Sequence, residues 1–150
     1  MATTWVVVAD AARARIFSSR GGKRPLVELE TLTHPVARIA EREIGSDEPG
    51  RAFDSHGKGR HALTDKGAIK QHETEEFARE IAARLDAARK DDTFQHLILV
   101  APPSMLGALR EHLPSPSAKR LFYALDKDLT QDTGDAIRAR LPEFFPNDLR

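Results

Sequence analysis

The chain opens with apolar segments separated by short polar connections. Residues 4–9 are mostly β-branched or aromatic, which is typical of a buried strand, and the polar connection 10–13 follows them. Residues 14–18 resume the pattern, and because four residues are too few for a parallel crossover, we predict antiparallel neighbours. Over residues 26–33, apolar and acidic residues alternate, which indicates a third strand with one solvent-exposed face. The alternating residues are Val27, Glu28, Leu29 and Glu30.

A long helix is predicted over residues 68–89. Its apolar residues recur at helical spacing and form the stripe of an amphipathic helix. Glutamates crowd its first half and basic residues its second, as the helix dipole favours. The stripe consists of Ile69, Phe77, Ile81, Leu85 and Ala88.

The last third of the chain alternates strand and helix. Leu97–Val100 is continuously apolar, as in a strand buried on both faces, and we predict that it is the centre of the sheet. A helix over 104–113, a strand over 120–125 and a helix over 133–141 follow. The whole chain is therefore predicted to be a single three-layer α/β domain, residues 1–150, with a mixed sheet of about five strands flanked by helices.

Residues 34–65 lack any sustained periodicity and contain several glycines and prolines. Compact domains rarely keep more than about 15 structureless residues unless the segment is functional or disordered. We therefore predict a long basic, glycine-containing loop here.

Composition excludes several classes of function. The 150 residues include 23 basic and 23 acidic side chains and no cysteine, which excludes thiol catalysis, disulfides and cysteine zinc sites. The longest apolar run, 97–103, is far shorter than the ~20 residues of a membrane helix. With no basic leader before the first strand, we expect a cytoplasmic protein without a membrane contact.

Charge is nevertheless unevenly distributed along this neutral chain. Residues 13–24 hold five basic residues and no acidic one, and residues 51–70 hold five basic residues against Asp54 and Asp65. Two clusters of cations favour an anion-binding surface, and the alternative is a solvated charged loop. The basic residues are Arg13, Arg15, Arg20, Lys23 and Arg24 in the first segment and Arg51, Lys58, Arg60, Lys66 and Lys70 in the second.

The segment Gly57–His61 has the sharpest local pattern, Gly-Lys-Gly-Arg-His. Its two glycines allow the backbone to approach a ligand closely, and the cations suit phosphate. It is not a Walker loop, because that motif requires glycine at 52 and serine or threonine at 59. We interpret it as a phosphate or nucleic-acid contact, with a flexible turn as the alternative.

Metal and cofactor sites are not predicted. Asp54, His56 and His61 have no second ligand cluster to accompany them. Asp10, Asp126 and Asp128 follow strands, where the carboxylates of a metal-dependent phosphoesterase gather, although such residues more often form turns.

Several segments along nearly the whole chain carry a family resemblance. They are Trp5–Asp10, Ala12–Phe17, Gly50–Ser55, Leu99–Pro103 with Leu106 and Gly107, and Lys127–Thr130. Together they resemble the bacterial host attachment protein family, the proteins required for attachment to host cells. That family is in turn similar to the middle domain of archaeal and eukaryotic peptide release factors, an α/β domain, and the order of elements agrees.

In the release factors, the long loop carries a Gly-Gly-Gln tripeptide that promotes ester hydrolysis. The corresponding region here offers Gly57-Lys58-Gly59, and no glutamine follows paired glycines anywhere in the chain. No catalytic residue is therefore assigned, and we expect a protein that is not an enzyme. The resemblance leaves a scaffold that presents a basic glycine loop, for which it implies RNA as the ligand.

The resulting hypothesis is a non-enzymatic RNA-binding factor that contacts tRNA or the ribosome and needs no cofactor. The two alternatives are an attachment- or adhesion-associated interaction protein, as the family name implies, and a metal-dependent phosphoesterase. No oligomeric state is predicted. The predicted binding residues are Arg13, Arg15, Arg51, Ser55, Gly57, Lys58, Gly59, Arg60 and His61, with Arg20, Lys23 and Arg24 expected to face them.

Overall fold

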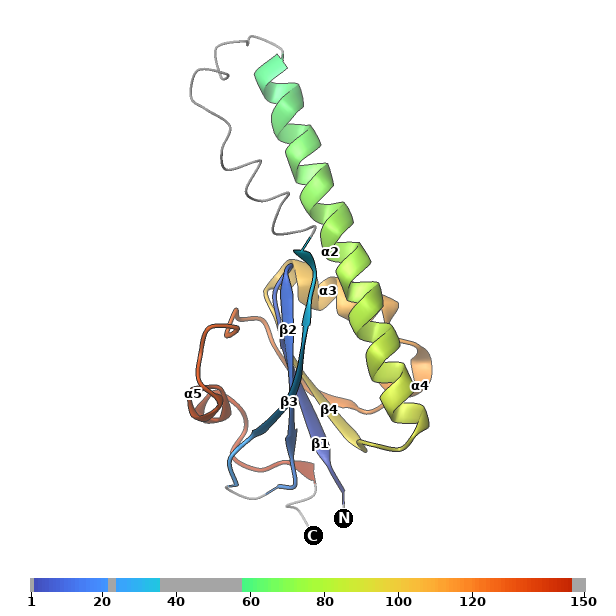
Figure 1. The fold of residues 1–150 in the computed structure, drawn as a ribbon, viewed down its shortest axis with the longest axis vertical. Helices are drawn as coiled ribbons and strands as arrows, with labels where there is room; N and C mark the ends of the chain where they lie inside the picture. Colours follow the sequence, from blue (N-terminus) through green and yellow to red (C-terminus); the bar gives the residue numbers. More distant parts are fainter. Residues whose placement is uncertain (1, 22–23, 36–57, 147–150) are drawn as a thin grey trace.

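A computed structural model describes residues 2–21, 24–35 and 58–146, with the backbone alone for 58–66. The order of elements agrees with the α/β fold that the sequence predicts (Figure 1). The strands are β1 (Thr4–Ala9), β2 (Arg13–Ser19), β3 (Val27–Thr33), β4 (His96–Val100) and β5 (Leu121–Leu125). The helices are α2 (Lys58–Lys90), α3 (Pro103–His112), α4 (Ser115–Ala118) and α5 (Gly134–Ala139).

The five strands form one mixed sheet in the order β3-β2-β1-β4-β5. β2 pairs antiparallel with both β1 and β3, as the short connection at 10–13 predicts. β4 pairs parallel with both β1 and β5. The central strand is β1, so the prediction that Leu97–Val100 is the centre was wrong by one position. β1 and the Leu97–Val100 part of β4 are fully buried, and an apolar run alone does not distinguish the middle strand from its inner neighbour.

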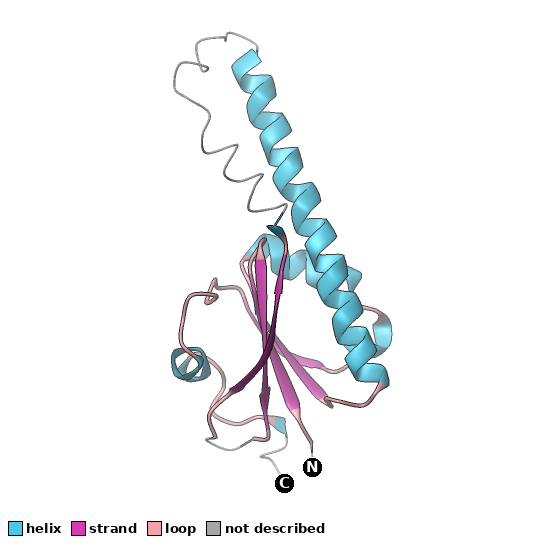
Figure 2. Ribbon diagram, viewed as in Figure 1, coloured by secondary structure: helices cyan, strands magenta, loops and turns pink. Residues whose placement is uncertain are grey.

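Helices cover both faces of the sheet and complete three layers (Figure 2). One face packs against α2 and α3 around Trp5, Phe77 and Leu109, and Trp5 stacks on Phe94 with ring centroids 5.0 Å apart. The other face packs against α5 and the chain that follows it, around Phe17 and Phe145. In the described part of the chain, no helix combines the length and the apolar character that crossing a membrane requires.

The helix α2 begins ten residues earlier than the sequence predicts. Residues 58–65 were assigned to the long loop, but they form the first turns of this 33-residue helix, which is about 50 Å long. Gly59, Gly67 and the lack of an apolar stripe before Ile69 concealed this start. Once the packed part of a helix has formed, each further residue adds a hydrogen bond, so the helix extends through a segment of poor propensity.

The strand β3 departs from the predicted alternation. Its partner register shifts between Ile16 and Phe17, which marks a bulge, so Glu28 and Glu30 lie opposite residues that point to different faces of the sheet. Val27 and Leu29 are exposed as a result. The prediction of one apolar and one acidic face was therefore wrong, because a single extra residue reverses the face of every side chain beyond it.

Candidate functional site

The first thirteen residues of α2, 58–70, form a segment that we call the distal arm. The arm extends past the edge of the sheet, whereas the rest of the helix lies along the sheet and α3 (Figure 1). Among the side chains of α2 that the structure describes, the first buried ones are those of Thr74, which is 6% exposed, and Phe77, which is fully buried. Residues 67–70 are exposed. At 1.5 Å per residue, the arm is about 20 Å long.

The distal arm is strongly basic. Residues 58–70 contain four basic residues and one acidic residue, whereas residues 71–90 contain four basic and five acidic residues. The first turn of α2 contains no acidic residue. Because a helix N-terminus carries partial positive charge, the charges of Lys58 and Arg60 add to it rather than offset it. The sequence predicts a helix with an acidic N-terminal half, but with its start at residue 58 the helix has a basic N-terminal end.

The predicted binding residues divide into three groups. Arg51, Ser55 and Gly57 lie outside the described residues. Lys58, Gly59, Arg60 and His61 have their backbone in the first turn of α2, at the far end of the distal arm. Arg13 and Arg15 lie at the start of β2.

Arg13 and Arg15 hold the segment that follows β5. Both guanidinium groups donate to the carbonyl oxygen of Thr130, from Nη2 of Arg13 at 2.7 Å and Nη1 of Arg15 at 3.0 Å. Arg15 also donates to the carbonyl of Asp132 at 2.6 Å, and its Nε and Nη2 bind Glu28 in a bidentate pair at 3.0 and 2.9 Å. The hydrogen bond between Arg15 and Glu28 raises the pKa of the guanidinium and lowers the pKa of the carboxyl. Binding of phosphate by these two arginines stays a prediction.

Two further cations of segment 13–24, Arg20 and Arg24, lie at the far end of β2 from Arg13. Both side chains are exposed, in the connection between β2 (Arg13–Ser19) and β3 (Val27–Thr33). A strand of seven residues, as β2 is, carries the chain about 20 Å. The expectation that the cations of segment 13–24 lie together, facing the second basic segment, was therefore wrong for Arg20 and Arg24. Lys23 lies outside the described residues.

A crevice of about 530 Å³ opens where the distal arm meets the sheet. It lies at the carboxyl ends of the parallel strands β1 and β4, the position at which ligands commonly bind to α/β sheets. Its polar lining includes Lys70, which is exposed, and Ser104 at the start of α3. Ser104 was not predicted as a lining residue, although its position just after an apolar strand and two prolines was the available signal. The full lining is Asp10, Ala11, Ala12, Gly67, Lys70, Gln71, Glu73, Thr74, Pro102, Ser104, Met105 and Asp128.

The structure brings together two of the three aspartates considered for a phosphoesterase. Asp10 and Asp128 each approach the hydroxyl of Thr130, at 3.1 and 2.6 Å, while Asp126 is exposed and outside the crevice. Oδ1 of Asp10 also accepts hydrogen bonds from the backbone N–H groups of Ala12 and Arg13 at 2.8 Å. Among the described residues, the three aspartates do not form a cluster with metal-ligand spacing.

Comparison with known proteins gives one family and several distant relatives. Residues 5–141 match a family described as "Protein required for attachment to host cells". An uncharacterised protein of Rickettsia prowazekii (strain Madrid E) is 26% identical over 141 residues, covering 88% of this chain and 87% of the relative.

Two solved structures are similar at 14% identity. One, described as an archaeal protein, has a TM-score of 0.45 and matches 90% of this chain. The other, an archaeal translation termination factor, has a TM-score of 0.43 and matches 92% of this chain. The chain spans about a third of the length of each, 32% and 37%.

Proposed function

The chain belongs to the family of proteins required for attachment to host cells, and we propose that its molecular role is to bind structured RNA, either tRNA or the ribosome, in the cytoplasm and without catalysis. The observation that carries this proposal is the distal arm, a projecting helix segment with four basic residues and one acidic residue. The predicted residues Lys58, Gly59, Arg60 and His61 are at its far end. In this proposal the arm supplies the RNA contacts.

The charge at the end of the arm suits phosphate for two independent reasons. Its basic residues supply cations that release counterions from a polyphosphate when they bind it. The backbone N–H groups of the first turn, which have no acceptor within the helix, and the positive end of the dipole also favour an anion. Within the chain, cations at a helix N-terminus are unfavourable by about 0.3–1 kcal/mol each. An RNA phosphate at this position removes that penalty.

The position of the arm suits a large ligand better than a small one. The first turn lies at the tip of a projection about 20 Å long, and no described residue encloses it as the walls of a metabolite pocket would. Lys70, at the base of the arm, is exposed and makes no ion pair with any described residue. The arm thus carries basic residues near both of its ends, as binding a polyanion that runs along it would require.

The test is a titration of fluorescently labelled tRNA and of ribosomes at several salt concentrations. We expect the double substitution Lys58→Ala with Arg60→Ala to weaken binding at least about tenfold and to reduce the salt slope by about two, one unit for each phosphate contact. The matched control is Arg20→Ala with Arg24→Ala, which removes two exposed cations at the other end of the sheet. Equal effects of the two double substitutions, or no effect of the first, would contradict the proposal.

A second candidate, a metal-dependent phosphoesterase, is favoured by the crevice and by Asp10 and Asp128 beside it. This candidate predicts turnover of nucleotides or nucleic acids in the presence of Mg²⁺ or Mn²⁺, and loss of that turnover in Asp128→Asn. It requires no contribution from the distal arm. Turnover that survives Lys58→Ala with Arg60→Ala but not Asp128→Asn would therefore favour the enzyme over the RNA-binding factor.

A further inference from the structure

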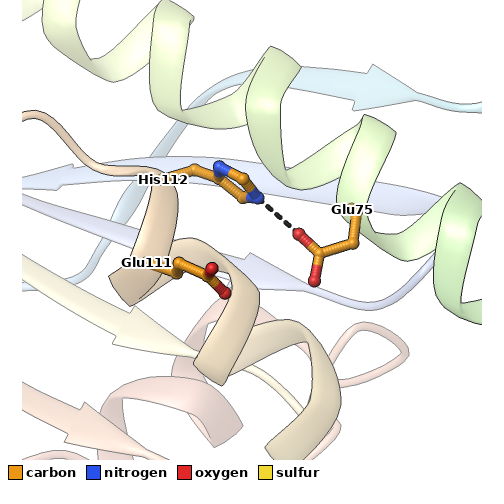
Figure 3. Close-up of side chains that lie close together, drawn as sticks. All are labelled: Glu75, Glu111 and His112. Carbon is orange, nitrogen blue, oxygen red and sulfur yellow. Dashed lines mark hydrogen bonds and ion pairs between the residues drawn. The ribbon is translucent and has the colours of Figure 1, made fainter.

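Three potential metal ligands converge where α2 packs against the end of α3. Glu75 lies on α2, and Glu111 and His112 lie in the last turn of α3 (Figure 3). One ligand atom from each residue, two carboxylate oxygens and an imidazole nitrogen, lies within 4.8 Å of the other two. This group is separate from the distal arm and is not part of the crevice lining.

Two of the three side chains are already fixed in position. His112 Nε2 forms an ion pair with Oε2 of Glu75, and Gln71 Nε2 donates to the other oxygen of Glu75 at 2.9 Å. The side chains of Glu75 and His112 are 24% and 20% exposed, so the pair is partly shielded from water. The hydrogen bond with His112 lowers the pKa of Glu75 below its ordinary value.

The third residue, Glu111, takes no part in the ion pair between Glu75 and His112. Within the described part of the chain, it has no hydrogen bond or ion pair of its own, yet its carboxylate approaches both partners. It adds a second negative charge beside Glu75, and it lies at the C-terminal end of α3, where the helix dipole is negative. One histidine carries at most a single positive charge, so the cluster as it stands is negative.

A divalent cation would neutralise this cluster and also interact favourably with the end of the helix. One imidazole nitrogen and two carboxylate oxygens are a ligand set that Zn²⁺ uses, with bonds of about 2.0–2.2 Å and ligand atoms about 3.3 Å apart. Small rotations of the side chains bring atoms within 4.8 Å of one another to that spacing. Mg²⁺ is a poorer match, because it prefers oxygen ligands alone.

We propose that Glu75, Glu111 and His112 bind one Zn²⁺ ion and that the ion links α2 to α3. The exposed side of the cluster leaves a fourth position to water. Sequence spacing did not reveal these ligands, because Glu75 is separated by 36 and 37 residues from the other two, and the packing of two helices brings them together. The inference is independent of the proposed RNA binding.

The experiment is a calorimetric titration of the full chain with Zn²⁺ after treatment with a chelator, repeated with Co²⁺ to record its visible absorption. We expect one equivalent to bind, with a Co²⁺ spectrum of low coordination number and a rise in the melting temperature on adding Zn²⁺. Glu111→Gln should weaken binding roughly tenfold or more. Since Glu111 has no partner in the described structure, this variant should fold as the parent does.

The matched control is Glu76→Gln, which removes the neighbouring carboxylate of α2 that pairs with Arg79 instead. It should bind Zn²⁺ as the parent does. His112→Gln should lose binding as Glu111→Gln does. Binding in Glu111→Gln that equals the parent's, or the lack of saturable binding in the parent, would overturn the proposal.

Discussion

The hydroxyl of Thr130 is buried between two carboxylates. The backbone carbonyl of Thr130 accepts hydrogen bonds from two arginines. The side chain is 1% exposed, and it lies 2.6 Å from Asp128 Oδ1 and 3.1 Å from Asp10 Oδ2. A hydroxyl has a single proton, so it can donate fully to one carboxylate at a time, and the shorter contact indicates Asp128. Thr130 therefore connects the loop after β5 to the end of β1.

We expect Thr130→Val to lower the free energy of unfolding by about 1–3 kcal/mol, because the substitution keeps the shape but removes the donor between two carboxylates. Urea denaturation measures the difference. Thr33→Val is the control, since Thr33 is exposed on the edge strand and valine also favours a strand. A loss in Thr130→Val no larger than in Thr33→Val would show that the hydroxyl does not stabilise the loop.

The sequence shows which residues are charged, but it does not show which groups those residues contact. Arg13 and Arg15 stand in a basic, polar segment, and that pattern favoured an anion-binding role. Their acceptors include the carbonyl of Thr130, more than a hundred positions further along the chain. Only the packing of the loop after β5 against β2 brings that acceptor within reach, so a local pattern cannot predict it.

At the scale of elements, apolar periodicity predicted the packed segments well and the unpacked ones poorly. The stripe from Phe77 to Leu85 identified the part of α2 that covers the sheet, and Leu97–Val100 identified β4. The start of α2 was missed, because the sequence carries no apolar stripe over residues 58–67. The single turn α4 was also missed, since Pro114 and Pro116 indicated only the end of α3.

The separation of the distal arm from the core predicts different effects for two glycine substitutions. Gly67 and Gly107 both lie inside helices, and a Cβ at either position would meet no atom within 4 Å beyond its chain neighbours and the backbone of its own helix. Alanine in place of glycine should stabilise each helix by about 0.5–1 kcal/mol. For Gly107→Ala on α3, which packs on the core, the gain should appear in the global free energy of unfolding.

For Gly67→Ala, we expect slower amide hydrogen exchange in residues 58–70 and little change in global unfolding. The reason is that a helix segment whose backbone projects beyond the sheet can open while the sheet stays folded. Hydrogen exchange and urea denaturation of both variants measure the two effects separately. If Gly67→Ala raised the urea midpoint as much as Gly107→Ala, the arm would be part of the cooperative unit.

At the scale of the whole molecule, three carboxyl groups with lowered pKa values each join one element to another. Glu28 binds Arg15 between β3 and β2, Glu75 binds His112 between α2 and α3, and Asp86 accepts from Ser117 of α4 at 2.8 Å. In each case the hydrogen bond is the main reason that the pKa lies below its ordinary value. For Asp86, Ser117 is the largest cause and Arg89 the second.

These three groups predict the direction of the acid dependence of stability. Because the folded state holds their protons less tightly than the unfolded state, the unfolded chain binds more protons in acid. Their stabilisation is complete above the ordinary pKa values, 4.5 for glutamate and 3.8 for aspartate, and is lost as the pH falls through the lower folded values. The urea midpoint should therefore be constant near neutrality and decrease below about pH 5.

Asp86→Asn tests whether these specific contacts cause that decrease. The variant should be less stable than the parent at neutral pH, because the amide is a weaker acceptor for Ser117 and Arg89, and it should lose less stability in acid. Asp126→Asn is the control, since Asp126 is exposed and bonds to none of the described residues. Its midpoint should follow the parent's at every pH. Parallel acid profiles for Asp86→Asn and the parent would instead assign the acid loss to general charge repulsion across the whole molecule.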